Sequence, residues 1–163
     1  MRTLVLVLAM TISAVAADKT FENSVLSFRY PDSATLNELD FDYMPEISWK
    51  LMIDGKAAII GMQRDDETSQ QQLLDSASAT IKRHLDGGSA SDLTTFGALQ
   101  RCKGITVKGP SKNPNYQGEV AVHVVTFTSG KKTVLLVAIV PAGDARFTEV
   151  LTTVRGSVKL KNN

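Results

Sequence analysis

The sequence predicts an α+β protein in which a mainly antiparallel β-sheet is flanked by helices, as an α/β/α sandwich. Three observations predict it. Residues 47–62 read as a hairpin, with alternating apolar residues on both sides of Asp54-Gly55. Residues 119–127 and 133–140 are apolar at nearly every position, as in strands covered on both faces. Two further segments carry apolar residues at helical spacing.

The first 17 residues read as a signal peptide rather than as part of the fold. Arg2 supplies a positive start, residues 4–12 are apolar, and small residues precede cleavage after Ala16 or Ala17. The apolar run of about 14 residues is shorter than the roughly 20 that span a bilayer. An uncleaved membrane anchor is the alternative. We expect an exported protein, periplasmic or secreted, that is not an integral membrane protein after cleavage.

Residues 18–163 then form one domain, which is long enough to bury a core. The full chain has 18 basic and 17 acidic residues, and removal of Arg2 leaves 17 of each. A net charge near zero argues against a nucleic-acid partner and against a polybasic membrane surface. Cys102 is the only cysteine, so the chain forms no internal disulfide.

The stretch VLSFRYPDS predicts the opening strand. Leu26, Phe28 and Tyr30 would share one side, and Pro31 would end the strand. Residues 32–45 then read as a connection with turn chemistry.

In the hairpin that follows, a two-residue turn places Ile53 opposite Lys56. The register then pairs Leu51 with Ala58, Trp49 with Ile60 and Ile47 with Met62. Trp49 is expected in the core, and an aromatic platform for a ligand is the alternative.

A helix is expected from about Thr68, where the spacing to Gln71 fits a capping box. Its apolar stripe comprises Leu74, Ala77, Ile81 and Leu85. Gly87-Gly88 would end it after roughly five turns, because glycine tolerates the left-handed conformation there.

The second half of the chain predicts further strands and a closing helix. Residues 89–108 hold one or two strands, with 99–107 the stronger, and residues 109–118 form a loop. The two apolar strands then make a central antiparallel hairpin. A second helix follows Ala142-Gly143, with Asp144 near its N-terminus and Gly156 at its end, and a short basic tail follows. The stripe of that helix comprises Phe147, Val150, Leu151 and Val154.

These features resemble the PsbP-like α/β/α sandwich family, which includes an extrinsic photosystem protein and the DcrB-type periplasmic proteins. The resemblance rests on VLSFRYPDS, WKLMIDGKAAII, the late strand pair and FTEVLTTVRGSVKL, and residues 89–118 match poorly. It implies exported accessory proteins whose work is mostly non-catalytic: assembly, docking or binding around larger complexes. No family-wide catalytic motif is implied.

The remaining candidates for chemistry have structural interpretations that we favour. Cys102 with His123 or His84 could form a thiol enzyme, but neither histidine lies in a catalytic signature. His84 suits a helix end, and His123 lies inside an apolar strand, where we expect a structural hydrogen bond. One cysteine and two distant histidines do not make a zinc spacing, so we expect no catalytic residue, metal or cofactor.

We therefore expect a non-catalytic binding or accessory protein that contacts a protein or an envelope component. The connections 32–45 and 109–118 are the expected contact loops, with Tyr43, Asn115 and Tyr116 as possible contacts. The alternatives are the thiol enzyme and an apolar-ligand carrier with a cavity between sheet and helix. The sequence does not identify the partner.

Overall fold

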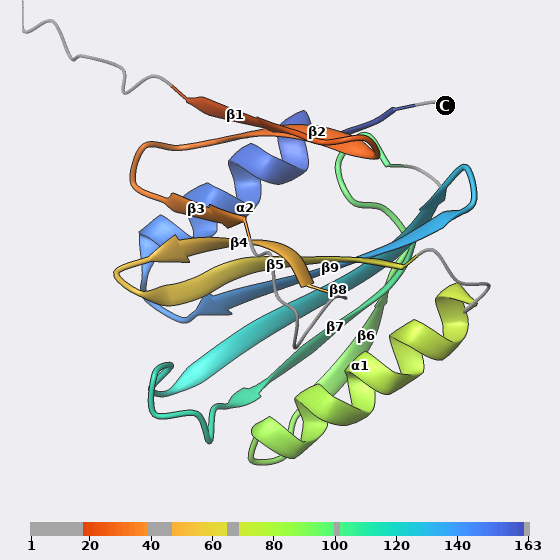
Figure 1. The fold of residues 1–163 in the computed structure, drawn as a ribbon. Coiled ribbons are helices and arrows are strands. Elements are labelled where there is room, and N and C mark those ends of the chain that lie inside the picture. The colour runs from red at the N-terminus through yellow and green to blue at the C-terminus, as the bar shows by residue number, and fades with distance from the viewer. Residues whose placement is uncertain (1–17, 39–46, 65–68, 100–101, 162–163) are drawn as a thin grey trace, which may run out of the picture.

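The computed structural model describes residues 18–38, 47–64, 69–99 and 102–161, which form ten strands and two helices (Figure 1). The elements are β1 (Lys19–Glu22), β2 (Leu26–Tyr30), β3 (Thr35–Glu38), β4 (Ile47–Ile53), β5 (Lys56–Arg64), α1 (Gln70–His84), β6 (Ser89–Leu93), β7 (Lys103–Pro110), β8 (Glu119–Ser129), β9 (Lys132–Pro141), α2 (Ala145–Ser157) and β10 (Lys159–Leu160). Seven strands form the main sheet, in the order β3-β4-β5-β9-β8-β7-β6, and every pairing in it is antiparallel. The predicted α+β class is confirmed.

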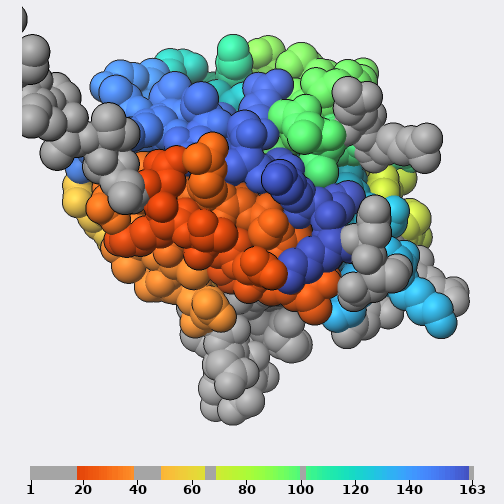
Figure 2. Space-filling view, turned by 90° about the horizontal axis from the view of Figure 1, so that it is seen from above, coloured from red at the N-terminus to blue at the C-terminus, as the bar shows by residue number. Residues whose placement is uncertain are grey.

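The main sheet lies between two unequal covers. On one face α1 packs against β7 and β8 (Figure 1). On the other face α2 lies beside a small sheet of β1, β2 and β10, and the two form one continuous surface (Figure 2). The expectation of helices alone on both faces is therefore corrected, because a second sheet shares one face with α2.

The predicted central hairpin of β8 and β9 is confirmed. Each of the two strands has neighbours on both sides. Val124 and Val125 point to opposite faces of the sheet, and both are fully buried. Burial on both faces is what the nearly continuous apolar run predicts.

The hairpin of β4 and β5 has the predicted turn but not the predicted register throughout. Asp54 and Gly55 have φ values of 48° and 75°, which suit a two-residue hairpin turn. The outer pairs are as predicted: Ile53 lies opposite Lys56, and Ile47 lies opposite Met62. Between them Leu51 pairs with Ile59, and Trp49 pairs with Gly61.

Two irregularities cause this change, one between Ile47 and Trp49 and one between Leu51 and Met52. They place a glycine opposite the indole of Trp49, where a larger residue would collide with the ring. Trp49 is 2 % exposed, and its ring centroid lies 4.7 Å from Phe28 and 5.3 Å from Phe21. Its predicted place in the core is confirmed.

The small sheet contains the predicted opening strand and two strands that the sequence analysis did not predict. In β2 the side chains of Leu26, Phe28 and Tyr30 are buried and Arg29 is exposed, as expected. The expected basic tail is in fact β10, which pairs with β2 so that Leu160 packs against the core. Residues 35–38, expected as a connection, form the short edge strand β3 against β4.

Helix α1 has a capping box, one residue later than predicted. The side chain of Ser69 accepts from the backbone N–H of Gln72, whose side chain accepts from the backbone N–H of Ser69. The expected cap, Thr68, lies outside the described residues. The helix spans 15 residues, about four turns.

The end of α1 also differs from the expected glycine stop. Leu85 is already extended and forms a bridge with Ser111, while the carbonyl of His84 accepts from the backbone N–H of Lys112. Pairing with the turn after β7 therefore ends the helix. Gly87, with a φ of 78°, comes after this point.

The middle segment has two strands, β6 and β7, which is one of the two expected alternatives, but the second strand starts later than the expected residue 99. A bridge between Phe96 and Leu99 makes a tight turn there, so the second strand begins only at Lys103. It continues through Pro110, which shortens the expected loop.

Helix α2 begins as predicted, with Asp144 accepting from the backbone N–H of Arg146. It continues past Gly156 to Ser157, because the backbone N–H of Val158 still bonds to the carbonyl of Val154.

Candidate functional site

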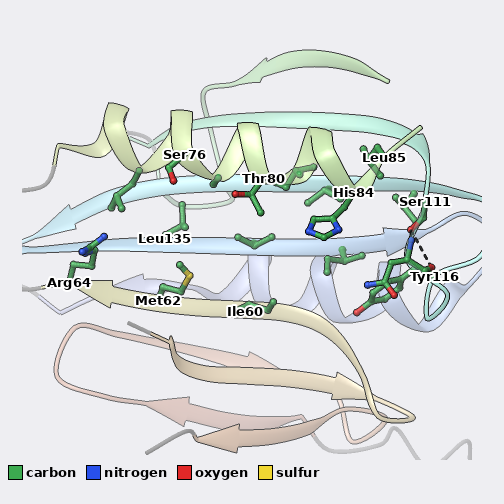
Figure 3. A pocket seen from close by; sticks show the side chains of 18 residues that line it. Ile60, Met62, Arg64, Ser76, Thr80, His84, Leu85, Ser111, Tyr116 and Leu135 are labelled. Carbon is green, nitrogen blue, oxygen red and sulfur yellow. Dashed lines mark hydrogen bonds between the residues drawn. The ribbon is translucent and has the colours of Figure 1, made fainter. Parts of the chain in front are cut away.

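An open apolar groove, which we call the α1 groove, lies between α1 and the main sheet (Figure 3). Its volume is about 370 Å³. The floor is formed by side chains of β5, β8 and β9, including Ile60, Met62, Val122, Leu135, Val137 and Ile139. This volume and this apolar lining are typical of small-molecule sites.

The groove exists because α1 is displaced toward one side of the sheet. The helix packs over β7 and β8 and approaches β9 only slightly. The strip of β5 and β9 beside the helix is therefore left partly open. Met62, Val137 and Ile139 are apolar but only partly buried there. Apolar side chains that are exposed along a concave strip are a common sign of a binding surface.

The described strands of the floor are paired with neighbours on both sides, so the floor presents side chains and not the edge of a sheet. β5 is bonded to β4 and β9, β9 to β5 and β8, and β8 to β9 and β7. Hydrogen-bonding groups are found instead at the rim and the ends. Ser76, Thr80 and His84 recur every four residues along the α1 side.

The two ends of the groove differ chemically (Figure 3). Arg64 lies at one end, near Met62. At the other end His84 lies close to Ser111 in the turn after β7, and Asn113 of the same turn also lines the groove. The hydroxyl of Ser111 accepts from the backbone N–H of Asn113 at 3.1 Å, which fixes this turn at the mouth of the groove.

Tyr116 lines the groove at the same end, near Ser111 (Figure 3). It is 7 % exposed, its hydroxyl donates to the carbonyl of Ala57 at 2.6 Å, and its ring meets Phe147 edge-on at 6.3 Å. Burial raises the pKa of this phenol, so the hydroxyl stays a donor at neutral pH.

Of the three sequence-predicted contacts, the structure describes Asn115 and Tyr116, and these two lie in different surroundings. Tyr116 lies under its loop and lines the groove, whereas Asn115 is exposed on the loop itself. Tyr43 lies outside the described residues.

Cys102 and the two histidines do not form an evident catalytic group. The thiol is buried, and burial raises its pKa, which favours the unreactive protonated form. The groups that oppose this shift are the backbone at Cys102 and Phe96 and the side chain of Arg155. Neither histidine is among them.

His123 bonds through Nδ1 to the hydroxyl of Thr106 at 2.9 Å, the structural bond that its place in the strand predicts. Burial, together with Arg155 and Lys108, lowers the pKa of His123.

Cys102 lies in a second, more polar hollow of about 280 Å³ between α1 and the β6–β7 edge, with Asp75 and Asp92 nearby. Across 18–38, 47–64, 69–99 and 102–161, no three histidine, cysteine or acidic side chains cluster as metal ligands do. Neither described helix combines the length and hydrophobicity needed to cross a membrane.

Of the residues that line the α1 groove, the sequence analysis gave only Tyr116 as a possible contact, and it assigned Ala77, Ile81 and Leu85 to the apolar stripe of the helix. One pattern in the sequence points to the groove residues of α1: the polar Ser76 and Thr80 each precede a residue of the apolar stripe, Ala77 and Ile81. That pattern marks the border of the apolar stripe, but it does not show which part of the stripe the sheet leaves uncovered.

The structure resembles two solved structures over most of its length. One is the solution structure of cyanobacterial PsbP (CyanoP) from Synechocystis sp. PCC 6803, with a TM-score of 0.56 and 9 % identity over 91 % of this chain and 95 % of that one. The other is LpqN, involved in cell envelope biogenesis of Mycobacterium tuberculosis, with a TM-score of 0.51 and 12 % identity over 88 % and 85 %. No protein-family model and no curated protein matches the sequence. The predicted PsbP-like fold is confirmed, and at this identity the likeness concerns the fold alone.

Proposed function

We propose that this protein is an exported, non-catalytic accessory protein of the cell envelope, and that it binds the apolar part of an envelope component in the α1 groove. In this proposal residues 1–17 are a signal peptide and residues 18–163 are the binding domain. Two structures with this fold support the proposal in outline. One of them, LpqN, is described as involved in cell envelope biogenesis.

The observation that carries the proposal is the groove itself. Its floor is apolar, and it includes side chains that the fold leaves partly exposed. Exposing Met62, Val137 and Ile139 to water costs stability, which a bound apolar group would restore. The apolar-ligand carrier considered from the sequence needs a cavity between sheet and helix. The groove has that position, although it is open rather than enclosed.

The thiol enzyme is the weaker candidate. A nucleophilic cysteine needs a lowered pKa and a base that can accept its proton. Burial shifts the pKa of Cys102 in the opposite direction. Asn115 and Tyr116, which adjoin the His84 end of the groove, are retained as proposed contacts with a partner, together with Tyr43.

The test compares two phenylalanine substitutions on α1 for binding of N-phenyl-1-naphthylamine, an uncharged apolar fluorophore. Ala77→Phe fills the groove, because Ala77 lines it. Ala79→Phe adds the same group on the exposed side of the same helix. We expect the first to weaken dye binding at least tenfold and the second to leave it unchanged. Equal binding by both variants and the unmodified protein would refute the groove as the site.

A second measurement tests export. The protein recovered outside the cytoplasm should begin at Ala17 or Asp18 when its N-terminus is sequenced. A chain that retains Met1 would contradict the signal peptide.

A further inference from the structure

We infer that the α1 groove takes a single-chain amphiphile, with its aliphatic chain on the floor and an uncharged, hydrogen-bonding head at the end formed by His84, Ser111 and Asn113. The inference rests on the proposed function and names the ligand class of the same site. Three properties of the groove lead to it: its shape, the saturation of its backbone groups, and the distribution of polar groups along it.

The shape fits one extended chain. The helix lines the groove from Leu73 to His84, and eleven steps of 1.5 Å make this about 16.5 Å long. Apolar side chains line the floor along this length, from the Arg64 end to the His84 end, so an extended aliphatic chain would contact them continuously.

The backbone of the groove excludes an extended peptide from its floor. A peptide brings an N–H and a C=O with every residue, and each loses water when it is buried. The three strands below have already paired their backbone groups with one another, and the backbone of α1 is paired within the helix. The floor therefore suits a hydrocarbon chain, which needs no hydrogen bonds. It offers no backbone partners for the N–H and C=O groups of a polypeptide.

The polar head belongs at the His84 end because hydrogen-bonding groups converge there. The imidazole of His84 and the side-chain NH₂ of Asn113 make no hydrogen bond within the part of the chain that the structure describes. Both side chains line the groove. The imidazole can donate or accept, and the amide can donate, so a hydroxylated head would find partners there.

The charges of the lining favour an uncharged head. Arg64 is the only Lys, Arg, Asp or Glu among the described residues that line the groove, and it lies at the opposite end. It also has an interaction of its own. Lys112, close to the head end in sequence, faces Asp86 at 3.8 Å instead. A carboxylate at the His84 end would find no Lys or Arg among the described lining residues there.

The test measures displacement of N-phenyl-1-naphthylamine by three 12-carbon probes: 1-lauroylglycerol and laurate below their micelle concentrations, and dodecane below its solubility limit. We expect 1-lauroylglycerol to compete best and laurate at least tenfold less well. His84→Ala should weaken binding of 1-lauroylglycerol by about threefold to tenfold, the loss of one hydrogen bond, after correction for the dye affinity of the variant. Lys82→Ala, an exposed change in the same helical turn, is the matched control.

The outcomes separate this inference from the proposed function. Tighter binding of laurate, or a His84→Ala protein that binds 1-lauroylglycerol normally, would overturn the assignment of the head. If no probe displaces a dye that Ala77→Phe does exclude, the ligand class is wrong while the groove remains the site. If Ala77→Phe fails to exclude the dye, both proposals fail.

Discussion

The indole ring of Trp49 lies directly over Gly61 of the neighbouring strand, so that a Cβ added at Gly61 would come within 2.1 Å of Trp49 Cε2. The rings of Phe21 and Phe28 hold the indole from the other side. Gly61→Ala should therefore destabilise the protein by about 1–3 kcal/mol, the usual cost of overpacking a core. Urea unfolding measures the change, and Trp49→Phe in the same chain should recover part of it.

Gly156→Ala also replaces a glycine with alanine, but it should raise the stability of the protein where Gly61→Ala lowers it. No atom lies within 4 Å of a Cβ added at Gly156, which lies within α2. Alanine should stabilise the protein by about 0.5–1 kcal/mol, because it restricts the unfolded chain and favours helix. If both alanine variants lose stability equally, the steric account of Gly61 is wrong.

Tyr116→Phe removes the hydroxyl that donates to the carbonyl of Ala57 while keeping the ring against Phe147. The expected cost is about 1 kcal/mol in the free energy of unfolding, since the carbonyl loses a buried donor. Tyr116→Ala should cost about 3–5 kcal/mol, because it also empties the ring site. Thermal melts of the two variants separate the contribution of the hydrogen bond from that of the packed ring. A Tyr116→Phe protein as stable as the parent would show that this hydrogen bond contributes nothing.

His123 makes stability depend on pH. Its folded pKa is lowered, chiefly by burial, below the ordinary value of 6.5, so the unfolded chain binds the proton more readily. The contribution of neutral His123 to the free energy of unfolding is complete above pH 6.5, and it is lost as the pH falls through the pKa of His123 in the folded protein. Urea midpoints should therefore decrease between pH 7.5 and 5, where carboxylates are still largely ionised.

His123→Gln is the control for this pH dependence. Glutamine cannot titrate but can still bond to Thr106, so the decrease should be smaller in this variant. An identical pH profile in the two proteins would exclude His123 as its source.

Cys102 should behave as a buried structural thiol. Its raised pKa and its burial predict that iodoacetamide at pH 8 modifies the folded protein at least tenfold more slowly than the urea-unfolded chain. Cys102→Ala should retain dye binding in the α1 groove, since Cys102 does not line it. Rapid modification of the folded protein would revive the thiol-enzyme alternative.

The sequence predicted the parts of the fold that depend on local pattern. The β8–β9 hairpin and the start of α2 follow from continuous apolar runs and a capping residue. The register around Trp49 could not be predicted, because it depends on the phenylalanines of a different sheet. β10 has only two residues and becomes a strand through β2, which is distant in sequence.

The α1 groove could not be predicted for a related reason. The apolar residues of β5 and β9 read as core, and Leu74, Ala77 and Ile81 predict only that α1 packs on the sheet. Where the helix lies across that sheet is a tertiary property. The displacement toward β7 and β8 decides which of these side chains stay partly exposed, and it becomes visible only in the structure.

The most direct test of the central claim is methyl NMR of the protein, labelled at Ile δ1 and Met ε, during titration with 1-lauroylglycerol. The account predicts saturable shift changes at Ile60, Met62, Ile81 and Ile139, which line the α1 groove. Ile53 and Ile59, buried in the core and absent from the lining, should not move. Shifts confined to other methyl groups, or no saturable shifts at all, would contradict the α1 groove as the binding site.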